Sequence, residues 1–153
     1  MGAVAEMNLE TSYRQSANDT FGDAYEYLMG MYAANAGKSG GEYYTPQEVS
    51  ELLARIATDG KTQVGRVYDP ACGSGSLLLK FAKLLGTENV KEFLGQESNP
   101  TTYNLCRINM LLHNIPFDKF DIAHGDTLIA PQHRHLEPFE AIVSNPPYST
   151  KWE

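Results

Sequence analysis

Two short stretches of this sequence combine residue types that could bind and activate small molecules. The first, residues 67 to 75, reads V-Y-D-P-A-C-G-S-G, and the second, residues 145 to 148, reads N-P-P-Y. Each contains polar groups beside residues that stiffen the backbone or expose it. The two stretches predict a donor site and an acceptor site, and the elements around them must bring the sites together.

In the first stretch, an acid and two glycines follow a short apolar run. Gly73 and Gly75 permit positive φ angles, so the backbone can approach a ligand without an intervening side chain. The glycine spacing matches neither the dinucleotide fingerprint nor a Walker A loop. The Asp69 carboxylate would repel phosphate but suits a cation. S-adenosylmethionine (SAM), which carries a sulfonium and an ammonium group, therefore fits better than ATP or NAD.

The second stretch has the features of a clamp for a planar molecule with an exocyclic amine. Its two prolines fix two φ angles and remove two N–H donors, which leaves carbonyl oxygens as acceptors. Asn145 precedes a proline and is held extended, so its side-chain oxygen and a proline carbonyl could accept both N–H bonds. Tyr148 supplies a flat face for stacking. The alternative is a structural Pro-Pro turn with a packed tyrosine.

Acids also end two further predicted strands. Glu97 ends a run at 92–97, where it could accept both ribose hydroxyls or be a solvated carboxylate. Asp126 ends a weaker strand at 121–126 and could accept a hydrogen bond from an adenine amine or belong to a turn. His133 and His135 could ligate a metal, but no suitably spaced partner accompanies them, so we predict no metal site.

The elements that position these residues alternate between strands and helices, which is typical of a parallel, doubly wound sheet. Apolar spacing predicts a helix over 76–85, and another is expected from Asn99 to about 113. A fourth strand is predicted at 139–144. If the first and fourth strands are neighbours, the acid of the first stretch and the amide of the second face one crevice.

An earlier helix is predicted from Thr45, which would cap it, with Pro46 at the first position and Glu48 completing a capping box. Its buried stripe would be formed by four apolar residues. These are Val49, Leu52, Leu53 and Ile56. Tyr44, just before this helix, could pack at the helix entry or face a ligand over the glycine loop.

Composition limits the remaining possibilities. A chain of 153 residues with 42% hydrophobic residues can form one globular domain. The net charge of −7 gives no evident footprint for nucleic-acid phosphates. Cys72 and Cys106 are isolated, as expected for thiols in a reducing cytoplasm. The sequence has no signal peptide and no apolar run of membrane-spanning length, so we expect a cytoplasmic protein without a membrane partner.

With both motifs in hand, the chain resembles an N6-adenine DNA methyltransferase, and most of all the modification subunit of a type I restriction–modification system. Five stretches carry the resemblance. They are 41–46 (G-E-Y-Y-T-P), 69–75, 95–97 (G-Q-E), 125–128 (G-D-T-L) and 145–148. The resemblance implies a Rossmann-like, SAM-dependent methyltransferase fold in the α/β class, with an incomplete parallel sheet of about four strands and flanking helices.

The resemblance also implies roles for individual residues. The cofactor site would comprise Tyr44, Thr45, Pro46, Asp69, Pro70, Ala71, Cys72, Gly73, Ser74, Gly75, Glu97, Asp126 and Thr127. The glycine loop would hold the methionine part of SAM, with Glu97 on the ribose and Asp126 on the adenine. The catalytic set would be Asn145, Pro146, Pro147 and Tyr148, acting on an adenine flipped out of duplex DNA.

The implied partners are double-stranded DNA in the complete assembly, a specificity subunit and a restriction subunit. Residues 1–41 would form an N-terminal helical segment and linker, and 42–153 the first part of the catalytic domain. The chain ends five residues after Tyr148, so we expect this fragment to be inactive alone. A protein-glutamine or RNA methyltransferase, and a non-catalytic SAM-binding or assembly module, are the alternatives.

Overall fold

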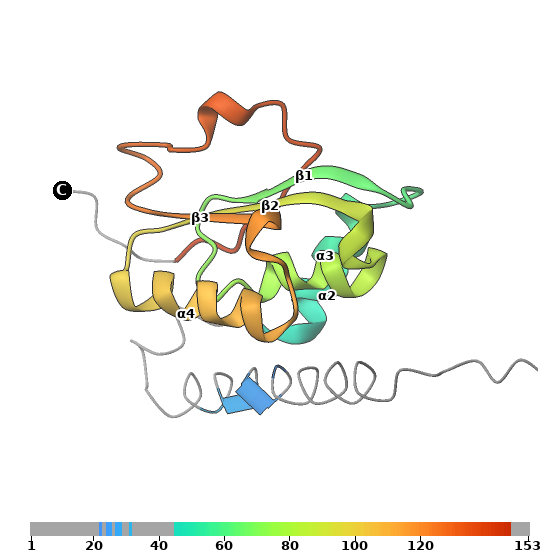
Figure 1. Ribbon diagram of the computed structural model, residues 1–153, viewed down its shortest axis with the longest axis horizontal. Helices are drawn as coiled ribbons and strands as arrows, with labels where there is room; N and C mark the ends of the chain where they lie inside the picture. Colours follow the sequence, from blue (N-terminus) through green and yellow to red (C-terminus); the bar gives the residue numbers. More distant parts are fainter. Residues whose placement is uncertain (1–21, 23, 26, 29–30, 32–44, 148–153) are drawn as a thin grey trace, which may run out of the picture.

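The computed structural model describes residues 22, 24–25, 27–28, 31 and 45–147 (Figure 1). Helices and strands alternate along this part of the chain. In order they are α2 (Gln47–Ala57), β1 (Val64–Asp69), α3 (Ser76–Leu85), η3 (Thr87–Asn89), β2 (Val90–Glu97), α4 (Pro100–Leu112), η4 (Phe117–Lys119), β3 (Phe120–His124), η5 (Arg134–Leu136) and β4 (Ala141–Ile142). Most of the predicted segment 1–41, with its linker, lies outside the described residues.

The strands form one parallel sheet in the order β3-β2-β1-β4. The chain moves outward from β1 to β3 and then returns to place β4 on the other side of β1. The strand order therefore reverses between β1 and β4. The prediction that the first and fourth strands are adjacent is confirmed. In open α/β sheets, ligands bind beyond the carboxyl ends of the strands at this point.

The two faces of the sheet are covered differently. Helices α2, α3 and α4 lie on one face, whereas the connection from β3 to β4, which includes η5, crosses the other (Figure 1). Val67 of β1 and Phe93 of β2 belong to the main core cluster, together with Leu78 and Phe81 of α3. Successive residues of a strand point to opposite faces. Tyr68 accordingly contacts the crossing connection, where its ring stacks on Phe139 at 4.7 Å.

The predicted boundaries of α3 and α4 are confirmed. Asn99 caps α4 by accepting hydrogen bonds from the N–H groups of Thr101 and Thr102, and Pro100 occupies the first helical position. Gly86, with a φ of 88°, follows the last residue of α3, where a glycine commonly ends a helix. Among the described residues, no helix is long and apolar enough to cross a membrane.

The predicted start of α2 is wrong by one residue. Pro46 has a ψ of 140°, outside the helical range, so α2 begins at Gln47 and no side chain caps it. The predicted buried stripe is also largely wrong: Val49, Leu52 and Ile56 are exposed. The buried residues of α2 are Ser50 and Ala54. Small side chains face the core because they allow α2 to lie close to its neighbours.

The fourth strand is shorter than predicted. Only Ala141 and Ile142 pair with β1, opposite Val67 and Tyr68. The N–H of Val143 makes one more hydrogen bond to the Tyr68 carbonyl, at 3.0 Å. Because β1 ends one residue later and is followed by a proline without an N–H donor, the ladder has no further partner. Beyond Val143 the chain leaves the sheet and leads to Asn145.

Candidate active site

The glycine loop between β1 and α3 takes the conformation that the sequence predicts. Gly73 and Gly75 have φ angles of 54° and 82°, a region that residues with a Cβ atom rarely adopt. A Cβ atom on Gly75 would also lie 2.7 Å from the Cys106 sulfur. Gly75 is therefore required both by its conformation and by the close approach of α4.

Neighbouring elements hold the loop from two sides. The Cys72 N–H donates to the Gln96 carbonyl of β2 at 3.0 Å. The Asn109 side chain of α4, itself buried, donates to the Ser74 carbonyl at 3.0 Å. These two bonds satisfy buried backbone groups that the loop geometry leaves without helical partners. Hydrogen bonds to β2 and α4 therefore hold the loop in place.

Asp69 ends β1 at the base of the loop and is 2% exposed. Burial raises the pKa of its carboxyl group from 3.8 to about 7, although the hydrogen bond from the Ala71 N–H at 3.0 Å favours the charged form. No lysine, arginine or histidine in the described part of the chain forms an ion pair with it. A buried acid without a cationic partner fits a positively charged ligand.

Glu97 ends β2 and faces the same loop. Its Oε2 accepts a hydrogen bond from the Gly73 N–H at 3.0 Å, and its Oε1 accepts one from the Asn99 N–H at 2.8 Å. Both oxygens are therefore held in place by the backbone. Since each carboxylate oxygen can accept two hydrogen bonds, the group keeps acceptor capacity for a ligand.

Asp126 and Thr127 follow β3 in a turn that adjoins the glycine loop. The Thr127 hydroxyl donates to the Pro70 carbonyl at 2.6 Å. Asp126 is exposed, and its Oδ1 accepts a hydrogen bond from the Leu128 N–H at 2.8 Å. The Thr127 hydroxyl thus joins two parts of the site, and direct contact of either residue with a cofactor stays a prediction.

Asn145 lies beyond β4 and shares a pocket with Asp69, as the strand order requires. The Asn145 side chain donates to the Thr45 hydroxyl at 3.2 Å. Pro146 and Pro147 are exposed, as is Pro46 before α2. The pocket is lined by Thr45, Asp69, Ala71, Cys72, Gly73, Ser74, Ser76, Leu77 and Asn145. Tyr44 and Tyr148 lie outside the described residues.

Two residues of the pocket were missed by the sequence interpretation. Ser76 and Leu77 form the first turn of α3 and line the pocket beside the loop. The Ser76 hydroxyl lies 3.0 Å from that of Ser74. The signal was available, because the start of a helix that follows a glycine loop lies next to whatever the loop binds.

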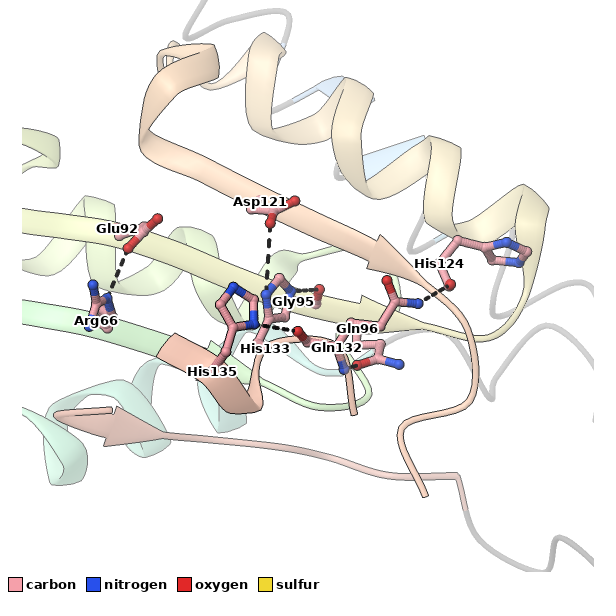
Figure 2. A network of polar contacts seen from close by, with 9 residues as sticks. All are labelled: Arg66, Glu92, Gly95, Gln96, Asp121, His124, Gln132, His133 and His135. Atoms are coloured by element: carbon pink, nitrogen blue, oxygen red, sulfur yellow. Dashed lines mark hydrogen bonds and ion pairs between the residues drawn. The ribbon is translucent and has the colours of Figure 1, made fainter. Parts of the chain in front are cut away.

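The two histidines of the crossing connection have separate surroundings. His133 is 1% exposed, and its Nε2 lies 2.9 Å from the Gly95 carbonyl oxygen. The Nδ1 atom of exposed His135 lies 3.0 Å from the Gln132 carbonyl oxygen (Figure 2). Within residues 45–147 and the few described before them, no three histidine, cysteine or acidic side chains gather as a metal site would require.

Comparisons with known proteins agree with this architecture. Residues 16–153 match the family described as N-6 DNA Methylase. A type I restriction enzyme methylase subunit, MpnII of Mycoplasma pneumoniae, is 54% identical over 98% of this chain and 29% of its own length. The chain therefore spans about three tenths of this relative.

Solved structures show the same relationship. The methyltransferase subunit of a type I restriction–modification system from Streptococcus thermophilus superposes with a TM-score of 0.77 at 40% identity, over 86% of this chain and 29% of that one. An O-methyltransferase from Bacillus cereus, solved with SAH, gives 0.56 at 16% identity over 80% of this chain and 54% of its own. The second likeness concerns the fold alone.

The fold, the glycine loop and these relatives lead to one assignment. The sheet and helices form part of the Rossmann-like methyltransferase fold, and the family match covers most of the sequence. The chain belongs to the N-6 DNA methylase family.

Proposed function

We propose that this chain forms the cofactor-binding and catalytic part of a methyltransferase that modifies the exocyclic amine of adenine in DNA. The observation that carries the proposal is that Asp69 and Asn145, from opposite sides of the strand reversal, line one pocket. An acid suited to a cationic methyl donor and an amide suited to the accepting amine then line the same pocket.

SAM fits the residues on the donor side. It supplies a methyl group activated by a sulfonium. The buried Asp69 carboxylate offers a negative charge where the cationic end of SAM would lie, and the turn at Gly73 leaves the backbone open to it. Glu97, oriented by two backbone N–H groups, is suited to the ribose hydroxyls. Asp126 keeps Oδ2 without a hydrogen bond from the described residues and is suited to the adenine amine.

Asn145 is the principal residue on the acceptor side. Its Nδ2 atom donates to the Thr45 hydroxyl, and in the proposal its Oδ1 accepts one N–H of the target amine. The carbonyl of Pro146 would accept the second N–H, and Tyr148 would stack on the base. Catalysis in such an arrangement consists mainly of positioning, with no strong general base.

The relatives support a larger assembly. The Mycoplasma pneumoniae protein is named a methylase subunit of a type I restriction enzyme. We place this chain in such a complex, with a specificity subunit that reads the DNA and a restriction subunit. A cytoplasmic location agrees with the two free thiols of Cys72 and Cys106.

The test is methyl transfer from tritiated SAM by a type I methylase subunit carrying this segment, assembled with its specificity subunit. Adenine-containing duplex DNA should be labelled, and Asn145→Ala should abolish the label. Release-factor peptide and RNA serve as parallel acceptors. Labelling of peptide or RNA but not of DNA would overturn the proposed substrate, and no labelling of any acceptor would overturn the activity.

A further inference from the structure

Gln96 is a fully buried polar residue beside the site that does not line the pocket. It precedes Glu97 in β2 and is 0% exposed. Its side chain lies on the sheet face that the β3–β4 connection crosses (Figure 2). A buried amide is costly unless its donors and acceptor are satisfied, so its partners show what it holds.

The partners of the Gln96 amide are all backbone groups of one segment. Its Nε2 donates to the Gly125 carbonyl at 3.2 Å and to the Ala130 carbonyl at 2.9 Å. Its Oε1 accepts from the Gln132 N–H at 3.0 Å. The amide therefore binds the segment before and after the turn that contains Asp126. Only a group with two donors and an acceptor in this arrangement can make all three bonds.

Apolar packing does not fix the place of the turn. Leu128 and Ile129 are 72% and 83% exposed, so its apolar side chains do not anchor it in the core. Inside the turn, the Ala130 N–H bonds the Asp126 carbonyl at 2.9 Å, which gives it shape but not position.

Three other hydrogen bonds of the described residues tie the segment to its surroundings. They come from the Thr127 hydroxyl to the glycine loop, from the Gly125 N–H to the Glu97 carbonyl at 3.0 Å, and from the Gln132 side chain to the His124 carbonyl at 2.7 Å. The Gln96 amide alone contributes three bonds, on both sides of the turn.

We propose that Gln96 is a positioning residue that sets the place of Asp126 and thereby the preference of the site for adenine in its cofactor. The inference rests on the proposed function, in which Asp126 accepts a hydrogen bond from the adenine amine. Gln96 touches no cofactor. It acts through the turn, as a link between the strand that ends in Glu97 and the residue that contacts the base.

The experiment compares two ligands by calorimetry on the purified chain. S-adenosylhomocysteine presents an amine to Asp126, whereas S-inosylhomocysteine presents an oxygen that a carboxylate repels. The native chain should bind the adenosyl ligand at least about tenfold more tightly, the scale of one hydrogen bond to a charged group. In Gln96→Met, which is similar in size but makes none of the three bonds, the ratio should fall below about threefold.

A purely structural role would predict a different result, because general loosening of the site lowers both affinities and leaves their ratio unchanged. Gln132→Ala is the matched control. It removes an exposed amide that bonds the His124 carbonyl at 2.7 Å, but keeps the backbone N–H that Gln96 uses. Its ligand ratio should stay native. An unchanged ratio in folded Gln96→Met would overturn the inference.

If thermal melting shows that Gln96→Met does not fold, Gly125→Ala tests the same link. Gly125 has a φ of 147°, which residues with a Cβ atom rarely adopt, so an alanine there strains the start of the turn while the Gln96 side chain is kept. The ratio should fall again, and a native ratio would overturn the inference. A native chain that binds neither ligand would instead refute the proposed cofactor site, and the inference with it.

Discussion

The Asn145 side chain donates a hydrogen bond to the Thr45 hydroxyl at 3.2 Å, although 100 residues separate the two along the chain. Thr45 was expected to cap α2, and its hydroxyl instead contacts the proposed acceptor amide. The segment before α2 and the end of β4 therefore meet over the pocket.

We expect Thr45→Val, which keeps the side-chain shape but removes the hydroxyl, to lower the methyl-transfer rate of a methylase subunit carrying this segment. The loss should be about threefold to tenfold, since one neutral hydrogen bond contributes about 0.5–1.5 kcal/mol. Thr45→Ser retains the hydroxyl and should keep most of the activity. Equal losses in both variants, measured as kcat at saturating SAM, would show that the hydroxyl is not responsible.

Removing the Asn145 side chain, the proposed hydrogen-bond acceptor for the target amine, should lower the rate of methyl transfer without weakening cofactor binding. Asn145→Ala should lower kcat about 100-fold to 1,000-fold, the scale seen when one hydrogen-bonding group of an oxyanion hole is deleted. SAM affinity, measured by calorimetry, should change less than about threefold, because Asn145 acts on the amine. Activity of Asn145→Ala within a few-fold of native would exclude the proposed amine-binding role of Asn145.

Asp69 makes the stability of the chain depend on pH. Its folded-state pKa of about 7 lies above the ordinary 3.8, so the folded state binds more protons than the unfolded state between these values. Stability from the protonated acid is fully present below about pH 4 and is lost as pH rises through 7. The difference between the two pKa values limits this contribution to the free energy of unfolding to about 4 kcal/mol.

We therefore expect Asp69→Asn, which resembles the protonated acid, to be more stable than the native chain at pH 8. An increase of about 1 kcal/mol would raise Tm by about 2–4 °C, and the increase should be smaller at pH 5. The same variant should bind SAM more weakly at both pH values. A difference in Tm that is independent of pH would contradict the assigned titration.

Two glycines with similar backbone angles allow a matched test of the loop. Gly73→Val places a branched side chain at a φ of 54° where the loop lines the pocket, and should abolish SAM binding. Gly60→Val introduces similar strain at a φ of 70°, in the exposed turn after α2. Both variants should lose stability in thermal melts, since left-handed backbone is unfavourable for β-branched residues. Native SAM affinity in Gly73→Val would refute the site.

Local signals in the sequence predicted much of this structure. The glycine loop, the cap at Asn99 and the apolar stripe of α3 depend on neighbouring residues, and each is found as expected. The strand neighbours could also be predicted, because parallel α/β sheets follow few topologies. The same rules placed Asp69 and Asn145 at one crevice.

Features that depend on tertiary packing could not be predicted in this way. The apolar residues of α2 identify an apolar face, but that face is exposed and Ala54 faces the core instead. Gln96 and His133 are polar residues in or beside a sheet, and nothing local indicates that both are buried. Both are buried where the β3–β4 connection crosses the sheet, and each contacts a backbone carbonyl oxygen there: Gln96 that of Ala130 and His133 that of Gly95.

The pairing of β4 with β1 also leads us to expect an order of assembly during folding. Val67 of β1 pairs with Phe93 nearby in sequence, but with Ala141 only after a long loop has closed. Contacts between residues far apart in the sequence form slowly, because the entropy of loop closure must be lost first. The glycine loop and Glu97 belong to the early, local pairing. We therefore expect the glycine loop and Glu97 to reach their native arrangement before Asn145 does.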